Sequence, residues 1–175
     1  GTFRGLNKNN VHDYHQYFCT DDSLGLPDNQ ITHLLRDSKN RFWVGTVNGV
    51  CLYTDKDNFR IIPIEADNKN VRQILEDRNG RIFLNTGFQL YAYHPREEKI
   101  TCVLPEISPG NAFYAQCHIA PDNNLWVMTS TGLRCYDPST LQLKESVALS
   151  GYPYYSYLHN NELWITGNHT LSIFD

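Results

Sequence analysis

Three common signatures of function are missing from this sequence. Its 15 Lys and Arg residues are outnumbered by 19 Asp and Glu residues, so no basic surface for direct nucleic-acid binding is expected. No apolar run approaches the roughly 20 residues of a membrane-spanning helix, and no charged-then-apolar leader opens the chain. The chain is therefore either soluble, or a part of a protein whose targeting and anchoring segments lie outside it.

Paired cysteines and metal-binding motifs are also missing. The five cysteines are an odd number and form no CxxC pair, which argues against a disulfide framework and a structural zinc site. His12 and His15 flank a carboxylate, but they lie in a polar loop where the helical spacing of a metal motif is not expected. The sequence has no G-x-S-x-G, Walker or H-E-x-x-H motif. We therefore expect no metal, no cofactor and no catalytic nucleophile.

An apolar cluster built on a bulky aromatic residue occurs four times. The central aromatics lie 40, 43 and 38 residues apart, and each cluster is followed by a small-residue turn and a second cluster ending in Tyr or Phe. A repeat of that length, rich in β-forming residues, has about the size of one four-stranded propeller blade. The central aromatics are Trp43, Phe83, Trp126 and Trp164.

The first segments of the repeats are read as strands. Residues 31–37 and 71–77 place apolar residues at i, i+3 and i+4, which could also be a helical turn. The third copy, residues 115–119, alternates instead, and one repeat must adopt one structure. The next segment is apolar on consecutive residues, as at 42–44, which predicts a strand covered on both faces, as in stacked blades.

The expected fold is all-β: a partial β-propeller of about four four-stranded blades, and a fragment of a larger propeller. Repeats of this kind pack mainly against their neighbours, so each boundary should fall in a connection. The expected units are 1–23, the tail of a preceding blade with its connection; 24–63, 64–105 and 106–146, three blade repeats; and 147–175, an incomplete fourth repeat.

Residues that recur in register are expected to be architectural. This applies to the four central aromatics, predicted to stack between blades, and to acidic residues assigned to matching turns. Glycoside hydrolysis would need two carboxylates close together, one of them with a raised pKa, whereas these acids recur in successive blades. They are Asp37, Asp77 and Asp122.

The stretch with the strongest functional character is rich in tyrosine. An aromatic ring stacks on the apolar C–H face of a pyranose, and its phenol hydroxyl adds hydrogen bonds. Alternate tyrosines in a strand also commonly pack between blades, so this alternative stays open. The candidate ligand-binding residues are Tyr152, Tyr154, Tyr155 and Tyr157.

The first unit resembles a known repeat. Residues 25–29 read Gly-Leu-Pro-Asp-Asn, residues 35–46 read Leu-Arg-Asp-Ser-Lys-Asn-Arg-Phe-Trp-Val-Gly-Thr, and Gly49-Val50 follow. This string is similar to the two-component regulator propeller repeat. The second unit departs from it at Phe83 and Asn85, where the repeat has Trp and Gly. The resemblance extends over essentially the whole chain and is most specific in the first copy.

This resemblance implies a periplasmic sensor region of a Bacteroidetes hybrid two-component system. In such proteins seven-bladed propellers precede a small β-sandwich, a membrane helix, histidine kinase and receiver domains, and a DNA-binding domain. They are similar to sensors of polysaccharide breakdown products that control glycan-utilisation genes through a phosphorelay. The chain would then be a non-catalytic, periplasmic part of an inner-membrane protein, without the kinase domain.

Two other classes of function remain open. A propeller lyase or glycosidase is one, because streptogramin-lyase-type propellers repeat strings like those at 122–128 and 136–138. A pure protein-interaction scaffold is the other. The expected partners are an oligosaccharide, other blades and domains of the parent chain, and a second copy. A homodimer is expected because a partial ring leaves apolar blade faces open.

Overall fold

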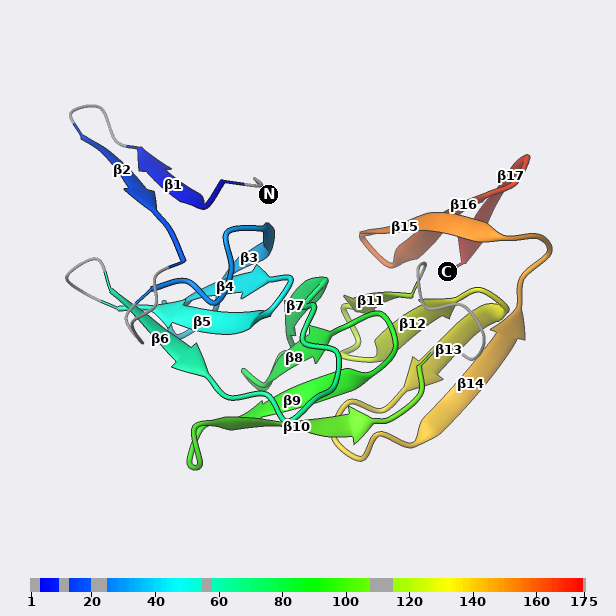
Figure 1. Cartoon of the computed structure of the whole chain (residues 1–175). Coiled ribbons are helices and arrows are strands. Elements are labelled where there is room, and N and C mark those ends of the chain that lie inside the picture. Colours follow the sequence, from blue (N-terminus) through cyan, green and yellow to red (C-terminus); the bar gives the residue numbers. More distant parts are fainter. Residues whose placement is uncertain (1–3, 10–12, 20–24, 55–57, 108–114, 175) are drawn as a thin grey trace.

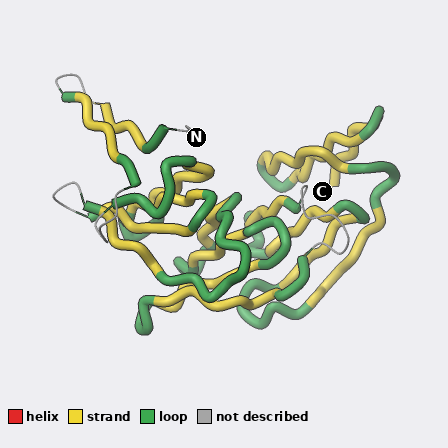
Figure 2. The backbone as a smooth tube through the Cα atoms, viewed as in Figure 1, coloured by secondary structure: helices red, strands yellow, loops and turns green. Residues whose placement is uncertain are grey.

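The computed structural model describes residues 4–9, 13–19, 25–54, 58–107 and 115–174. Every regular element in these ranges is a β-strand, as Figures 1 and 2 show. Within them, no helix is long and apolar enough to cross a membrane. The predicted all-β class is confirmed.

Seventeen strands form five antiparallel sheets in the described ranges, and within each sheet the strands are paired in chain order. The first sheet contains β3 (Ile31–Arg36), β4 (Phe42–Thr46), β5 (Gly49–Tyr53) and β6 (Phe59–Ile62). The second contains β7 (Gln73–Glu76), β8 (Ile82–Asn85), β9 (Leu90–His94) and β10 (Lys99–Leu104). The third contains β11 (Gln116–Ile119), β12 (Leu125–Thr129), β13 (Gly132–Tyr136) and β14 (Leu143–Ala148). The fourth contains β15 (Pro153–His159), β16 (Glu162–Gly167) and β17 (Thr170–Phe174), and β1 (Leu6–Asn9) pairs with β2 (Tyr14–Tyr17).

The four larger sheets follow one another along an arc (Figure 1). The first strands of neighbouring sheets are in contact: β3 with β7, β7 with β11, and β11 with β15. These strands line the inner side of the arc, as the innermost strands of propeller blades do. The predicted partial propeller of about four blades is confirmed, and both segments with an ambiguous helical pattern form strands, β3 and β7.

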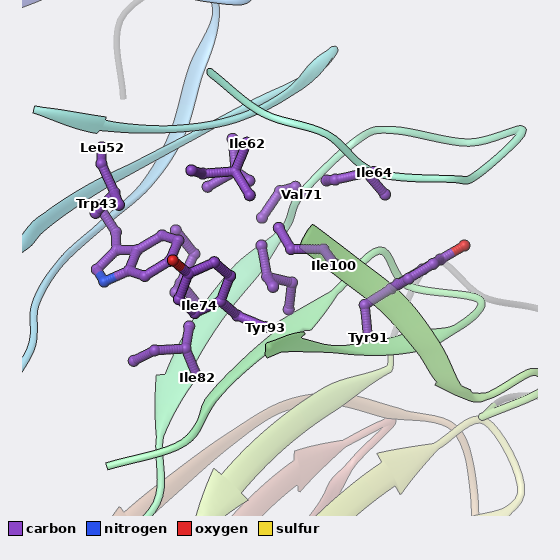
Figure 3. Close-up of a cluster of buried hydrophobic side chains, with 12 residues drawn as sticks. Trp43, Leu52, Ile62, Ile64, Val71, Ile74, Ile82, Tyr91, Tyr93 and Ile100 are labelled. Atoms are coloured by element: carbon purple, nitrogen blue, oxygen red, sulfur yellow. The ribbon is translucent and has the colours of Figure 1, made fainter. Parts of the chain in front are cut away.

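Apolar layers between successive sheets form the core. In Figure 3, Trp43 and Leu52 of the first sheet pack against Ile74, Ile82 and Tyr93 of the second. The second sheet packs on the third, and the third on the fourth, through equivalent layers. Because side chains alternate along a strand, a middle strand that is apolar on consecutive residues contributes to the layers on both of its faces. We call the packing of one sheet on the next the first, second and third junction.

Side-chain hydrogen bonds link the innermost strands. Gln73 Oε1 accepts from Cys117 N at 2.9 Å, and Gln116 Oε1 accepts from Ser156 N at 2.7 Å. Thr32 donates to the carbonyl of Val71 at the first junction. These bonds satisfy backbone groups that no strand of the same sheet pairs, so they hold the sheets in register.

The recurring aromatics differ in burial. Trp43 and Phe83 are fully enclosed by the first and second junctions, whereas Trp126 and Trp164 are half-buried. Trp126 faces the fourth sheet across a cavity. Among the residues that the structure describes, no sheet covers the face that carries Trp164. Equivalent positions in the repeat therefore differ in their environment.

Two of the three turn acids have the same structural role. Asp37 accepts hydrogen bonds from Arg41 N at 2.8 Å, Arg41 Nε at 2.6 Å and Trp43 Nε1 at 2.9 Å. Asp77 accepts from Arg81 N at 2.9 Å and from Arg81 Nε at 2.8 Å. We call each pair the Asp–Arg clamp. Burial acts to raise the pKa of Asp37, but the bonds from Trp43 and Arg41 outweigh burial and hold that pKa below its ordinary value.

Asp122 does not occupy the position that the sequence predicts. The backbone amide of Ala120 donates to the carbonyl of Asn124, and the carbonyl of Ala120 accepts from the amide of Asn123. In the first sheet, the backbone of Asp37 makes the same two bonds with Arg41 and Asn40. The third-sheet turn therefore has the same length as the first, and the counterpart of Asp37 is Ala120. The prediction for Asp122 was wrong because aligning the acids shifted the turn by two residues.

Candidate functional site

The candidate site is the outward face of the fourth sheet, which is the face turned away from the third sheet. On the opposite, inward face, buried Ser156 bonds to Gln116 of the third sheet, and its Oγ is hydrogen-bonded to His118 Nε2 at 2.7 Å. Side chains alternate along a strand, so Tyr155 and Tyr157, on either side of Ser156, lie on the opposite, outward face. Their exposed fractions are 56% and 57%.

Strand register adds side chains from β16 and β17 to this face. Trp164 is paired with Tyr157 on one side and Ile173 on the other. The Tyr157 and His159 rings are stacked with centroids 6.4 Å apart and planes 15° apart. Trp164 Nε1 donates to Glu162 Oε2 at 2.9 Å, which fixes the indole and places a carboxylate beside it. We call this surface the aromatic face; it comprises Tyr155, Tyr157, His159, Glu162, Trp164, Leu171 and Ile173.

Two of the four predicted tyrosines belong to the aromatic face. Tyr152 precedes β15 and is 65% exposed, and Tyr154 lies at the register shift between Pro153 and Tyr155. The regular alternation of the strand therefore places Tyr155 and Tyr157 on the aromatic face, whereas Tyr152 and Tyr154 lie outside that alternation.

Sequence reasoning missed Trp164 and His159 as members of the site. The repeat position of Trp164 predicts a core residue, and no sequence pattern singles out His159. Their signal lies in the pairing of β15 with β16, which places Trp164 opposite Tyr157 and Glu162 opposite His159. A hairpin with two residues at its tip, Asn160 and Asn161, sets that register, and it could have been read from the sequence.

The aromatic face corresponds to a covered face elsewhere in the molecule. Tyr155 is paired with Thr166 in the way that Gln73 is paired with Asn85 and Gln116 with Met128. Gln73 and Gln116 each bond to the following sheet. At this one position the fourth sheet therefore presents a tyrosine where the second and third sheets present a glutamine that links sheets.

His118 lies behind the aromatic face, at the third junction. Burial lowers its pKa to about 4, so the imidazole is neutral near pH 7. Its hydrogen bond to Ser156 Oγ gives it a role in packing. Among the described residues, no three His, Cys, Asp or Glu side chains are grouped closely enough to hold a metal ion.

A second cavity lies at the other end of the arc. It has a volume of about 570 Å³ between β1 and the first sheet. Two basic side chains, Lys8 and Arg36, line it beside Phe42 and Tyr53. Lys8 Nζ donates to the Tyr53 hydroxyl at 2.9 Å and Arg36 Nε to Asn40 Oδ1 at 2.6 Å. None of the predicted tyrosines lines this cavity.

These features define the chain as a segment of a β-propeller with an exposed aromatic sheet face. Within it, residues 25–48 match the family described as two component regulator propeller, so the resemblance seen in the sequence is confirmed for the first repeat. No curated protein matches the chain.

Solved structures share the fold over nearly the whole chain. The extracellular domain of the hybrid two component system BT4673 of B. thetaiotaomicron matches with a TM-score of 0.78 and 20% identity, over 99% of this chain and 25% of that one. The extracellular domain of BT3049 from the same organism matches with a TM-score of 0.75 and 21% identity, over 99% of this chain and 25% of that one. Virginiamycin B lyase from Staphylococcus aureus matches with a TM-score of 0.69 and 16% identity, over 96% of this chain and 61% of that one. The chain spans about a quarter of the length of the two-component structures.

Proposed function

We propose that the chain is a non-catalytic segment of the extracytoplasmic sensor region of a hybrid two-component system. The observation that carries this proposal is the two-component regulator propeller repeat at 25–48, together with the similarity of the fold to extracellular domains of such systems. The parent protein would then carry a larger, seven-bladed propeller anchored in the inner membrane through segments outside this chain.

We further propose that the sensed ligand is an oligosaccharide and that it binds the aromatic face, which requires that the next blade of the parent propeller leave this face open. Tyr157 and Trp164 lie side by side in register and offer aromatic surfaces on which sugar rings can stack. The Glu162 carboxylate accepts from the Trp164 indole and is only half-buried, so it can also accept from a sugar hydroxyl. Binding would rearrange the parent's domains and so control glycan-utilisation genes.

Binding of a panel of plant, animal and microbial oligosaccharides, followed by isothermal titration calorimetry, tests this proposal. One member of the panel should bind, and Tyr157→Ala or Trp164→Ala should weaken it at least tenfold. Tyr14→Ala is the matched control, because Tyr14 is equally exposed, at 62%, but lies on β2. The proposal would be contradicted if no oligosaccharide of the panel bound, or if Tyr14→Ala weakened the binding affinity as much as Tyr157→Ala or Trp164→Ala.

Self-association is a second proposal for the aromatic face, and it is an alternative to sugar binding because a second copy would cover the same side chains. Leu171 and Ile173 are 60% and 49% exposed, and an apolar face of this kind is energetically unfavourable in water. Two copies could cover it in a two-fold contact. Sedimentation equilibrium should show a dimer that Ile173→Lys converts to monomer, while a monomer at every concentration would refute it.

A further inference from the structure

The third junction contains a cavity near the β11–β12 turn. Its volume is about 390 Å³, and its walls include Trp126, Asp122 and Asn161. A neighbouring recess of about 30 Å³ is also lined by Trp126 and Asn161, together with Leu163 and Phe174. The cavity therefore lies at the turns, and the recess beside it is bordered by aromatic rings from adjacent sheets.

At the first junction, an arginine fills the equivalent space. The Arg41 guanidinium lies 5.2 Å from the centroid of the Trp43 ring and 5.5 Å from that of Tyr93 in the next sheet. In the fourth sheet, Phe174 is the counterpart of Tyr93. Phe174 pairs with Leu163 in the way that Tyr53 pairs with Phe42, and Tyr53 and Tyr93 hold the same position in their repeats. The first junction thus shows what this space accepts: a guanidinium between two aromatic rings.

The second junction is filled in the same way. The Arg81 guanidinium lies 5.5 Å from the centroid of the Phe83 ring, and its Nη2 donates to Ser139 Oγ of the third sheet at 3.4 Å. An Asp–Arg clamp anchors the guanidinium at both junctions.

The third junction keeps the aromatic residues but lacks the guanidinium. Asn124 stands in place of the arginine and Ala120 in place of the aspartate. The Asn124 amide is turned away, bonded to Asp122 and, through Oδ1, to Lys144 Nζ at 2.6 Å. Among the described residues, Trp126 Nε1 has no hydrogen-bond partner, unlike Trp43 Nε1, which donates to Asp37.

We propose that this cavity binds a small ligand that carries a guanidinium group. A flat, weakly hydrated cation fits against an indole face, and cation–π attraction strengthens as the site is desolvated. The Asp122 carboxylate on the wall supplies an opposite charge, from an exposed turn and not from the position of Asp37. The cavity volume is within the range of small-molecule sites. This site is separate from the aromatic face, so it does not depend on the function proposed above.

Indole N–H signals in nuclear magnetic resonance spectra of the whole chain provide the test. Methylguanidinium is the probe, and methylurea, which has the same shape without the charge, is the control. We expect a saturable shift of the Trp126 signal with a millimolar dissociation constant, and at least tenfold weaker binding of methylurea. Equal responses to the two compounds, or a Trp126 shift with glucose and none with methylguanidinium, would overturn the proposal.

A variant that fills the cavity sharpens the test. Ala120→Asp combined with Asn124→Arg restores the chain's own Asp–Arg clamp, and we expect it to abolish the methylguanidinium response. It should also raise Tm by about 2–4 °C, the shift that one added net interaction gives in a domain of this size. If that variant does not fold, Asp122→Asn preserves the shape and should weaken the probe several-fold. An unchanged response in the folded variant refutes the proposal.

Discussion

The first and third junctions follow one plan but are closed differently. At the first, buried Asp37 collects Arg41 and the Trp43 indole, and the guanidinium seals the space between two rings. At the third, Ala120 and Asn124 cannot do so, and a cavity remains beside Trp126. Both nevertheless retain an apolar layer. Sheets can therefore pack without the Asp–Arg clamp, through an apolar layer and the hydrogen bonds of Ser156 to Gln116 and His118. Where the clamp is missing, the turn-side edge of the junction is open.

The largest expected difference concerns the two tryptophans. Trp43→Ala removes a fully buried side chain and should lower the free energy of unfolding by about 3–5 kcal/mol. Trp126 is half-buried and already borders a cavity, so Trp126→Ala should cost about 1 kcal/mol. Urea unfolding followed by circular dichroism measures both. Similar losses would mean that the two junctions are equally closed in solution.

A smaller difference is expected between the two acids. Asp37→Ala leaves Trp43 Nε1 and the amide of Arg41 without their acceptor and should cost about 1–3 kcal/mol. Asp122 bonds within its own exposed turn, so Asp122→Ala should change stability by less than about 0.5 kcal/mol. Thermal unfolding of both variants at pH 7 makes the comparison. If Asp122→Ala destabilised the chain as much as Asp37→Ala does, Asp122 would be equivalent to Asp37, which the turn geometry contradicts.

The smallest expected effect is the pH dependence of the third junction. The pKa of His118 is 6.5 in a model peptide and about 4 in the fold, so the unfolded chain binds a proton more readily between these values. The contribution of His118 to stability is therefore full above pH 6.5 and declines as the pH falls toward 4. His118→Gln should flatten the curve of Tm against pH in that window. A slope that is unchanged in the variant would show that other groups cause it.

Much of the fold could be predicted from local patterns. The 40-residue period indicates propeller blades, and the consecutive apolar residues of β4 indicate a strand covered on both faces. The Asp122 register was predicted incorrectly because two acids in similar turns look equivalent until backbone hydrogen bonds identify Ala120 as the counterpart. The alternation of β15 places Tyr155 and Tyr157 on one face, whereas the register shift at Tyr154 is not predicted by any local pattern.

The sequence by itself determined the repeat, its strands and the positions at which aromatic side chains recur, because these follow from short-range periodicity and turn chemistry. Only the tertiary structure decided what each recurring side chain meets. Trp43 meets an arginine and a tyrosine, Trp126 borders a cavity, and Trp164 lies on an exposed face. The physical reason is that burial depends on the neighbouring sheet, and the residues of that sheet lie some 40 positions away in the chain.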